Sequence, residues 1–142
     1  MSTEPALAGY HHVGITVTDV ETSESWYSKT LGLVRAFVEP HAGTKDGGYA
    51  VVMTRPGTPF FLGLDHHAEA DKLPFDARRT GLDHVALAVS RPEELHAWAA
   101  HLDAIGVEHG PVIEGDEPMP SAMVHFVDPD GVPIEVLWVG HR

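Results

Sequence analysis

The chain has 142 residues, with 9 Lys and Arg against 21 Asp and Glu and a formal net charge of −12. This length and a hydrophobic fraction of 43% fit a single domain over residues 1–142 with a buried core, and they argue against disorder. The acidic balance argues against nucleic acid or an anionic membrane as a partner, since both select clustered Lys and Arg. Because Cys is absent, any transition-metal site must be built from the 11 His and the carboxylates.

The start of the chain carries neither the basic nor the apolar segment of a signal peptide. No apolar run approaches the roughly 20 residues that a membrane span requires. We therefore expect a cytoplasmic protein with no membrane partner.

One short pattern occurs twice, about half the chain length apart. Residues 12–17 read His-Val-Gly-Ile-Thr-Val, and residues 84–89 read His-Val-Ala-Leu-Ala-Val. Each predicted strand precedes a stretch with early acidic residues, an apolar stripe at helical spacing and a glycine stop, at Gly32 and Gly106. Three β-rich segments then follow each helix. They are 33–39, 49–54 and 59–65 in the first half, and 107–113, 121–127 and 133–139 in the second.

The repeat predicts an α+β fold of two tandem βαβββ modules. Module one covers about 8–65 and module two about 81–140, with a polar linker over about 66–80. Side chains alternate along a strand, so each first strand directs its large aliphatic residues to one face and one His plus two small residues to the other. These histidines are His12 and His84.

Glu135 is the single carboxylate in the otherwise apolar last strand, and burying an unpaired charge is costly. With His12 and His84 on inner faces, a metal ion is its natural partner. Two His and one Glu make the composition of a facial triad, which leaves about three coordination positions open. A register shifted by one residue would put His11 in place of His12.

Several short motifs keep a common order along the chain. They are Tyr-His-His-Val-Gly-Ile at 10–15, Trp26-Tyr27 with Leu31-Gly32-Leu33, Leu-Asp-His-Val-Ala-Leu at 82–87, and Phe-Val-Asp-Pro-Asp-Gly at 126–131 leading to Ile134-Glu135. Together they resemble the vicinal oxygen chelate superfamily, which includes glyoxalase I, type I extradiol dioxygenases, fosfomycin-resistance transferases and bleomycin-type resistance proteins. The resemblance implies a curved mixed sheet around a cupped metal site, a homodimer, and His12, His84 and Glu135 as ligands of one divalent metal.

The sequence departs from parts of this family pattern. In this family, glyoxalase I and methylmalonyl-CoA epimerase supply a fourth carboxylate ligand near the end of module one, where this chain has Phe61, Leu62 and Gly63. This favours the three-ligand members and an extradiol dioxygenase-like oxidoreductase with iron, Fe(II). The alternatives are a glyoxalase-like lyase or isomerase with Mn, Zn, Ni or Co, and a non-catalytic, drug-binding resistance protein. The expected substrate is a small molecule with vicinal oxygens, with aromatic compounds among the candidates.

Two residues are candidates for catalytic proton transfer. His125 lies on the predicted strand beside the one that carries Glu135, and an inward imidazole there could exchange a proton with bound substrate. Tyr49, on the middle strand of module one, is a second candidate proton donor, with a packing role as its alternative. His66 and His67 belong either to a solvated linker or to the mouth of the cleft. We interpret His96, His101 and His109 as surface residues.

Overall fold

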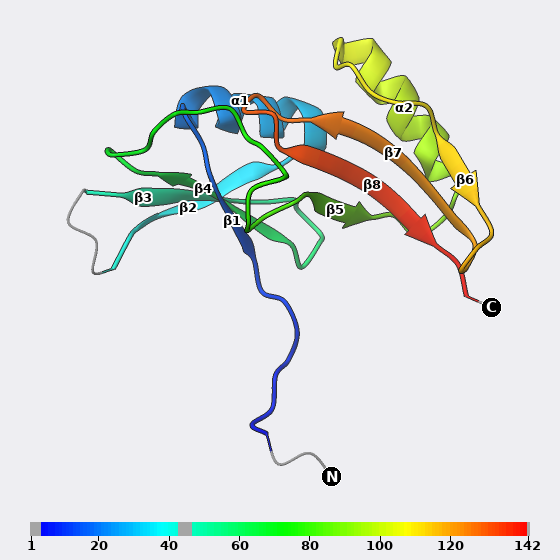
Figure 1. Cartoon of the computed structure of the whole chain (residues 1–142), viewed down its shortest axis with the longest axis horizontal. Helices are drawn as coiled ribbons and strands as arrows, with labels where there is room; N and C mark the ends of the chain where they lie inside the picture. Colours follow the sequence, from blue (N-terminus) through cyan, green and yellow to red (C-terminus); the bar gives the residue numbers. More distant parts are fainter. Residues whose placement is uncertain (1–3, 43–46, 142) are drawn as a thin grey trace.

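Two four-stranded sheets lie side by side in the computed structural model, which describes residues 4–42 and 47–141. In each module the order along the chain is strand, helix and three strands, as the repeat predicts (Figure 1). Module one consists of β1 (Val13–Thr16), α1 (Val20–Leu31), β2 (Val34–Pro40), β3 (Tyr49–Thr54) and β4 (Phe61–His66). Module two consists of β5 (Val85–Ala88), α2 (Glu94–Ile105), β6 (Ile113–Gly115), β7 (Ser121–Val127) and β8 (Pro133–Val139).

Both sheets have the same topology. The strand order is β1-β4-β3-β2 in module one and β5-β8-β7-β6 in module two, with a parallel first pair and antiparallel neighbours after it. The helices lie on one side of the sheets, and the other side, called the inner face below, carries no helix (Figure 1). The predicted fold of two βαβββ modules with mixed sheets is therefore confirmed, and the sheets do not close into a barrel.

Each helix begins and ends where local chemistry favours it. Asp19 accepts a hydrogen bond from the Thr22 backbone N–H at 2.9 Å and caps α1. Gly32 and Gly106 follow the two helices in the left-handed conformation, at φ of 69° and 73°, which glycine adopts without a Cβ clash. The two predicted helix stops are thereby confirmed.

The core lies between the sheets and their helices. Its fully buried side chains alternate along the strands, with Ile15, Leu62 and Leu64 in module one and Val124 in module two among them. The predicted helix-facing side of the first strand is correct. The strand predicted at 107–113 is wrong for most of its length, because β6 covers only Ile113–Gly115 and pairs with β7 through Ile113 and Met123.

The two modules contact each other on the helix side. Trp26 of α1 packs against Phe126 of β7, with ring centroids 6.1 Å apart, and His101 of α2 contacts the Thr30 carbonyl oxygen at 2.9 Å. His101 therefore binds across the module boundary, and His109 is also half-buried, so the interpretation of these two as plain surface residues is wrong. No helix among the residues at 4–42 and 47–141 is long and apolar enough to cross a membrane.

Candidate metal centre

The inner face of module two brings His84, His125 and Glu135 together. Glu135 pairs in register with Ala86 on one side and with His125 on the other. Its two carboxylate oxygens contact different rings: Oε2 lies 3.7 Å from His84 Nε2, and Oε1 lies 3.6 Å from His125 Nδ1. The carboxylate is mostly covered, with 15% of its side chain exposed, whereas both imidazoles are about two-fifths exposed. The sheet therefore presents one shielded carboxylate between two accessible imidazoles.

Asp83 orients the His84 ring. Its Oδ1 lies 2.7 Å from His84 Nδ1, which leaves Nε2 on the side of Glu135. The hydrogen bond with Asp83, and next the charge of Glu135, raise the pKa of His84 above its ordinary value. A carboxylate on the second ring nitrogen is the usual companion of a metal-ligating histidine, because it fixes the tautomer and the ring orientation. Sequence reasoning assigned no role to Asp83, although its position directly before His84 was an available signal.

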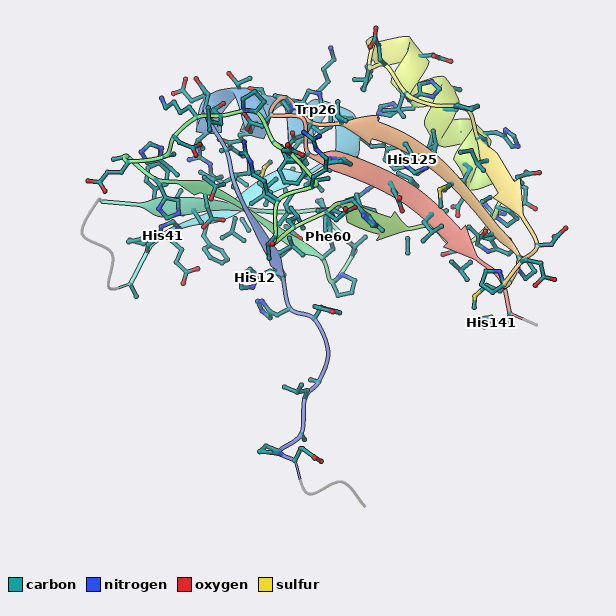
Figure 2. The ribbon with its side chains drawn as sticks, viewed as in Figure 1. His12, Trp26, His41, Phe60, His125 and His141 are labelled. Carbon is teal, nitrogen blue, oxygen red and sulfur yellow. The ribbon has the colours of Figure 1, made fainter. Side chains whose placement is uncertain are left out.

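His12 lies in the other module. It immediately precedes β1, is exposed, and has its Nδ1 2.9 Å from His11 Nδ1. Figure 2 shows His12 at the base of the projecting N-terminal segment and His125 in the other half of the molecule. Within the described ranges of a single chain, no three His, Asp or Glu side chains are grouped to hold a metal ion. One chain therefore assembles two of the three predicted ligands, because β1 and β5 are edge strands of separate sheets.

Two other candidates from the sequence lie on the helix side of module one. Tyr49 pairs in register with His66, and their rings are 4.9 Å apart. Tyr49 alternates with Ala50, so it shares the face of Val51 and Met53, which are core residues. This position suits packing. His67 lies beyond β4 and packs against His41 instead, with ring centroids 4.7 Å apart.

A second polar group, missed by the sequence reasoning, lies on the inner face of module one. His41 Nε2 contacts Asp65 Oδ1 at 2.7 Å, and both side chains are mostly buried, at 16% and 21% exposure. Asp65 pairs with Thr16 of β1 and with Ala50 of β3. A carboxylate near the end of an apolar strand was the available signal, as it was for Glu135.

The linker forms a shallow pocket against the end of β1. The pocket has a volume of about 210 Å³, and its walls include Thr16 and Thr18 from one side and Lys72, Phe75 and Arg79 from the other. The linker also contacts module two, because the Phe75 backbone N–H donates to the Asp130 carbonyl oxygen at 3.0 Å, so this polar connection is not fully solvated.

The comparisons with known proteins agree with this architecture. The sequence matches the glyoxalase/bleomycin resistance protein/dioxygenase superfamily over residues 9–136. The chain belongs to this superfamily. A search of curated proteins gave no significant match.

Solved members of the superfamily share the fold. A glyoxylase/bleomycin resistance protein/dioxygenase domain from Frankia sp. EAN1pec superposes with a TM-score of 0.80 at 25% identity, covering 95% of this chain and 100% of that one. A glyoxalase family protein from Enterococcus faecalis gives 0.70 at 23% identity, covering 92% and 97%. The fosfomycin resistance protein FosX from Listeria monocytogenes, solved with Mn(II) and sulfate, gives 0.63 at 14% identity, covering 96% and 95%.

Proposed function

We propose that this protein is a metal-dependent enzyme that binds a small molecule through two vicinal oxygens. The proposed ligands are His12, His84 and Glu135, and extradiol dioxygenase-like chemistry is the leading reaction. The observation that carries the proposal is the contact between His84 and Glu135 on an inner face, with Asp83 behind the imidazole. An ion pair built only for stability would not require the second carboxylate to hold the ring.

The donor set fits a divalent transition metal. Two imidazoles and one carboxylate are the residues of a facial triad, and they leave adjacent positions for two oxygens of one substrate. A bound ion would act as a Lewis acid toward those oxygens, and Fe(II) would add the capacity to use dioxygen. The same residues suit Mn, Zn, Ni or Co, which would favour lyase or isomerase chemistry.

The protein side chains supply orientation and proton transfer. Asp83 accepts the hydrogen bond of His84 Nδ1, which leaves Nε2 as the ring nitrogen that could bind a metal ion. Glu135 Oε1 lies 3.6 Å from His125 Nδ1, and in this proposal Nε2, the other ring nitrogen, is the atom that exchanges a proton with bound substrate. The Glu135 carboxylate is itself mostly shielded from water, with 15% of its side chain exposed.

We propose that a second copy of the chain completes the triad. His12 is exposed beside the edge strand β1, and His84 is exposed beside the edge strand β5, with the shielded Glu135 on the adjacent strand β8. A twofold dimer that apposes β1 of one protomer to β5 of its partner would form two equivalent sites, each with one His12 from the other chain. This explains why one chain separates residues that the family resemblance groups together.

Metal content of anaerobically purified protein tests the site. We expect about one equivalent per chain in the wild type and its loss in Glu135→Ala, with Glu114→Gln as the matched control because that carboxylate is 67% exposed and lies elsewhere, beside His96. Iron would direct assays to oxygen uptake with catechols, and the other metals to lyase and isomerase substrates. No metal after reconstitution with Fe(II), Mn(II) and Zn(II) would overturn the proposal and leave a non-catalytic binding protein.

A mixing experiment tests the shared site. His12→Ala and Glu135→Ala chains are unfolded together, refolded, and assayed for metal beside each variant alone. If each site uses both chains, heterodimers contain one intact site, and statistical mixing restores about a quarter of the wild-type metal. If each site lies within one chain, the mixture binds no more metal than its components.

A further inference from the structure

Asp65 lies on the inner face of module one with its carboxylate held in place. It alternates with Leu64, which is fully buried toward the helix, so the two side chains take opposite faces of β4. His41, which follows β2, contacts Oδ1 at 2.7 Å. The Asp65 carboxylate is thus held in position by His41, which lies at the end of β2.

Two glycines make room for the second oxygen of this carboxylate. Gly14 and Gly63 pair directly in register, and neither has a positive φ, so the backbone conformation does not require glycine at either position. A Cβ on Gly14 would lie 2.8 Å from Asp65 Oδ2, and a Cβ on Gly63 would lie 3.1 Å from the same atom. The space over these glycines is therefore occupied by the Asp65 carboxylate itself.

This carboxylate is close to the proposed ligand His12. Gly14 is two residues after His12, a separation of about 7 Å along an extended chain. Asp65 Oδ2 lies over Gly14, and β1 is the strand that the proposed dimer brings to the metal site. A substrate bound through its vicinal oxygens would extend over the inner face of module one, past Asp65.

The inner face of module one is negatively charged around Asp65. The only Lys or Arg within β1–β4, strands that the structure describes completely, is Arg35, and it pairs with Glu24 of α1 at 2.6 Å on the helix side. Glu39 pairs in register with Ala50, which itself pairs with Asp65, so Glu39 and Asp65 share the inner face. A ligand group placed there meets carboxylates and imidazole rings rather than Lys or Arg side chains.

We propose that Asp65, positioned by His41, determines substrate specificity by accepting a hydrogen bond from an amine or hydroxyl of the substrate. The inference rests on the proposed function, since it concerns the side of the same site that module one forms. It names the substrate class more narrowly: a vicinal-oxygen compound that carries an amine or hydroxyl donor beyond the chelating oxygens, and no carboxylate or phosphate at that point. His41 acts through Asp65 and is a positioning residue.

Three catechols with one chelating group test this specificity: catechol, dopamine with an aminoethyl arm, and dihydroxyphenylacetate with a carboxylate arm. Their affinities are measured by calorimetry on protein reconstituted with Mn(II) under argon, so that dioxygen does not consume them. We expect the wild type to bind dopamine at least about tenfold more tightly than dihydroxyphenylacetate, the factor typical of one charge-assisted hydrogen bond. Asp65→Asn should reduce that ratio to near one.

The control for long-range charge is Glu21→Gln on α1, which removes the same charge on the helix side and should keep the wild-type ratio. His41→Gln should give an intermediate ratio, because Asp65 remains but loses its fixed orientation. A role confined to stability would lower the melting temperature of Asp65→Asn and leave the ratio unchanged.

The outcomes separate the two proposals. If catechol itself does not bind to the metal-loaded wild type, the proposed function fails and this inference falls with it. If catechol binds but the wild type does not discriminate between the two substituted probes, the specificity role of Asp65 is overturned while the metal site stands. That second result needs no variant, so misfolding of Asp65→Asn cannot obscure it.

Discussion

Tyr27 donates its phenolic hydrogen to Asp128 Oδ2 at 2.8 Å, and this bond joins helix α1 of module one to the turn between β7 and β8 of module two. Both residues are buried, at 0% and 4% exposure. The other carboxylate oxygen accepts the backbone N–H groups of Asp130 and Val132, each at 2.9 Å. Asp128 therefore shapes its own turn and fixes the neighbouring module, which sets how the two inner faces are placed.

Loss of the Tyr27 hydroxyl should weaken this connection. Tyr27→Phe leaves Asp128 Oδ2 buried without its donor, which costs about 1–3 kcal/mol in the free energy of unfolding. Tyr49→Phe is the matched control, because the Tyr49 hydroxyl forms no hydrogen bond with the residues described here, and it should change stability much less. Urea denaturation followed by circular dichroism measures both. Equal effects of the two variants would show that the hydroxyl of Tyr27 contributes nothing specific.

Asp128 should also make stability depend on pH. Burial raises the pKa of its carboxyl in the folded chain, against the opposing effect of the N–H groups of Val132 and Asp130 and the Tyr27 hydroxyl. A raised folded pKa means that the folded chain holds this proton more tightly, so stability from Asp128 is present at acidic pH and declines as pH rises above the ordinary carboxyl pKa. Asp128→Asn keeps an acceptor and a donor but does not titrate.

We therefore expect wild type to lose stability relative to Asp128→Asn between about pH 4 and pH 7. Urea unfolding across that range measures the difference. Asp128→Ala is the second control, because it removes the hydrogen bonds and should be less stable than both at every pH. A wild type that gains on Asp128→Asn as pH rises would contradict the raised pKa.

The repeat predicted most of the fold because it determines local structure. The pattern around His12 recurs around His84, and this spacing together with the glycine stops was enough to place both helices and most strands. The strand predicted at 107–113 was wrong for most of its length because apolar composition does not identify a pairing partner. Within this stretch, His109 forms an isolated bridge with Phe126, and Ile113 alone belongs to the strand β6 that pairs with β7. The sequence placed His125 on the strand beside the one that carries Glu135, and the structure adds that the two residues pair directly in register.

The candidate site was harder to predict, because it depends on contacts between distant segments. Alternation was extended to His12, but β1 begins at Val13, so the side chain of His12 is not constrained by a strand register. Asp65 was overlooked because its partner His41 lies at the end of another strand. Whether two chains share a site is likewise set by surfaces and not by residue spacing.

Gly14 offers a test of the inner face that removes no charged group from the chain. In Gly14→Ala the new Cβ would lie 2.8 Å from Asp65 Oδ2, so the carboxylate must move away from its position over β1. We expect the ratio of dopamine to dihydroxyphenylacetate affinity to fall as it does in Asp65→Asn. Gly110→Ala is the control, because its Cβ would be 4.0 Å from the nearest atom, the His125 carbonyl oxygen. A Gly14→Ala protein with the wild-type ratio would show that the position of Oδ2 is unimportant.

His109 should add stability at acidic pH. Its Nδ1 lies 2.6 Å from the Gly110 carbonyl oxygen and its Nε2 lies 3.0 Å from Asp103 Oδ1, and an imidazole can donate from both nitrogens only when it is protonated. The Gly110 carbonyl, and next Asp103, raise the pKa of His109 above its ordinary value. This contribution is fully present below that ordinary value, about pH 6.5, and is lost as pH rises through the folded pKa.

His109→Gln should therefore lower the melting temperature most near pH 5.5 and progressively less toward pH 8. His96→Gln is the control, since that ring is 70% exposed and lies 3.9 Å from Glu114, and its effect should be small at every pH. A destabilisation by His109→Gln that grows toward pH 8 would mean that the neutral ring, and not the imidazolium, is the form bound between these two acceptors.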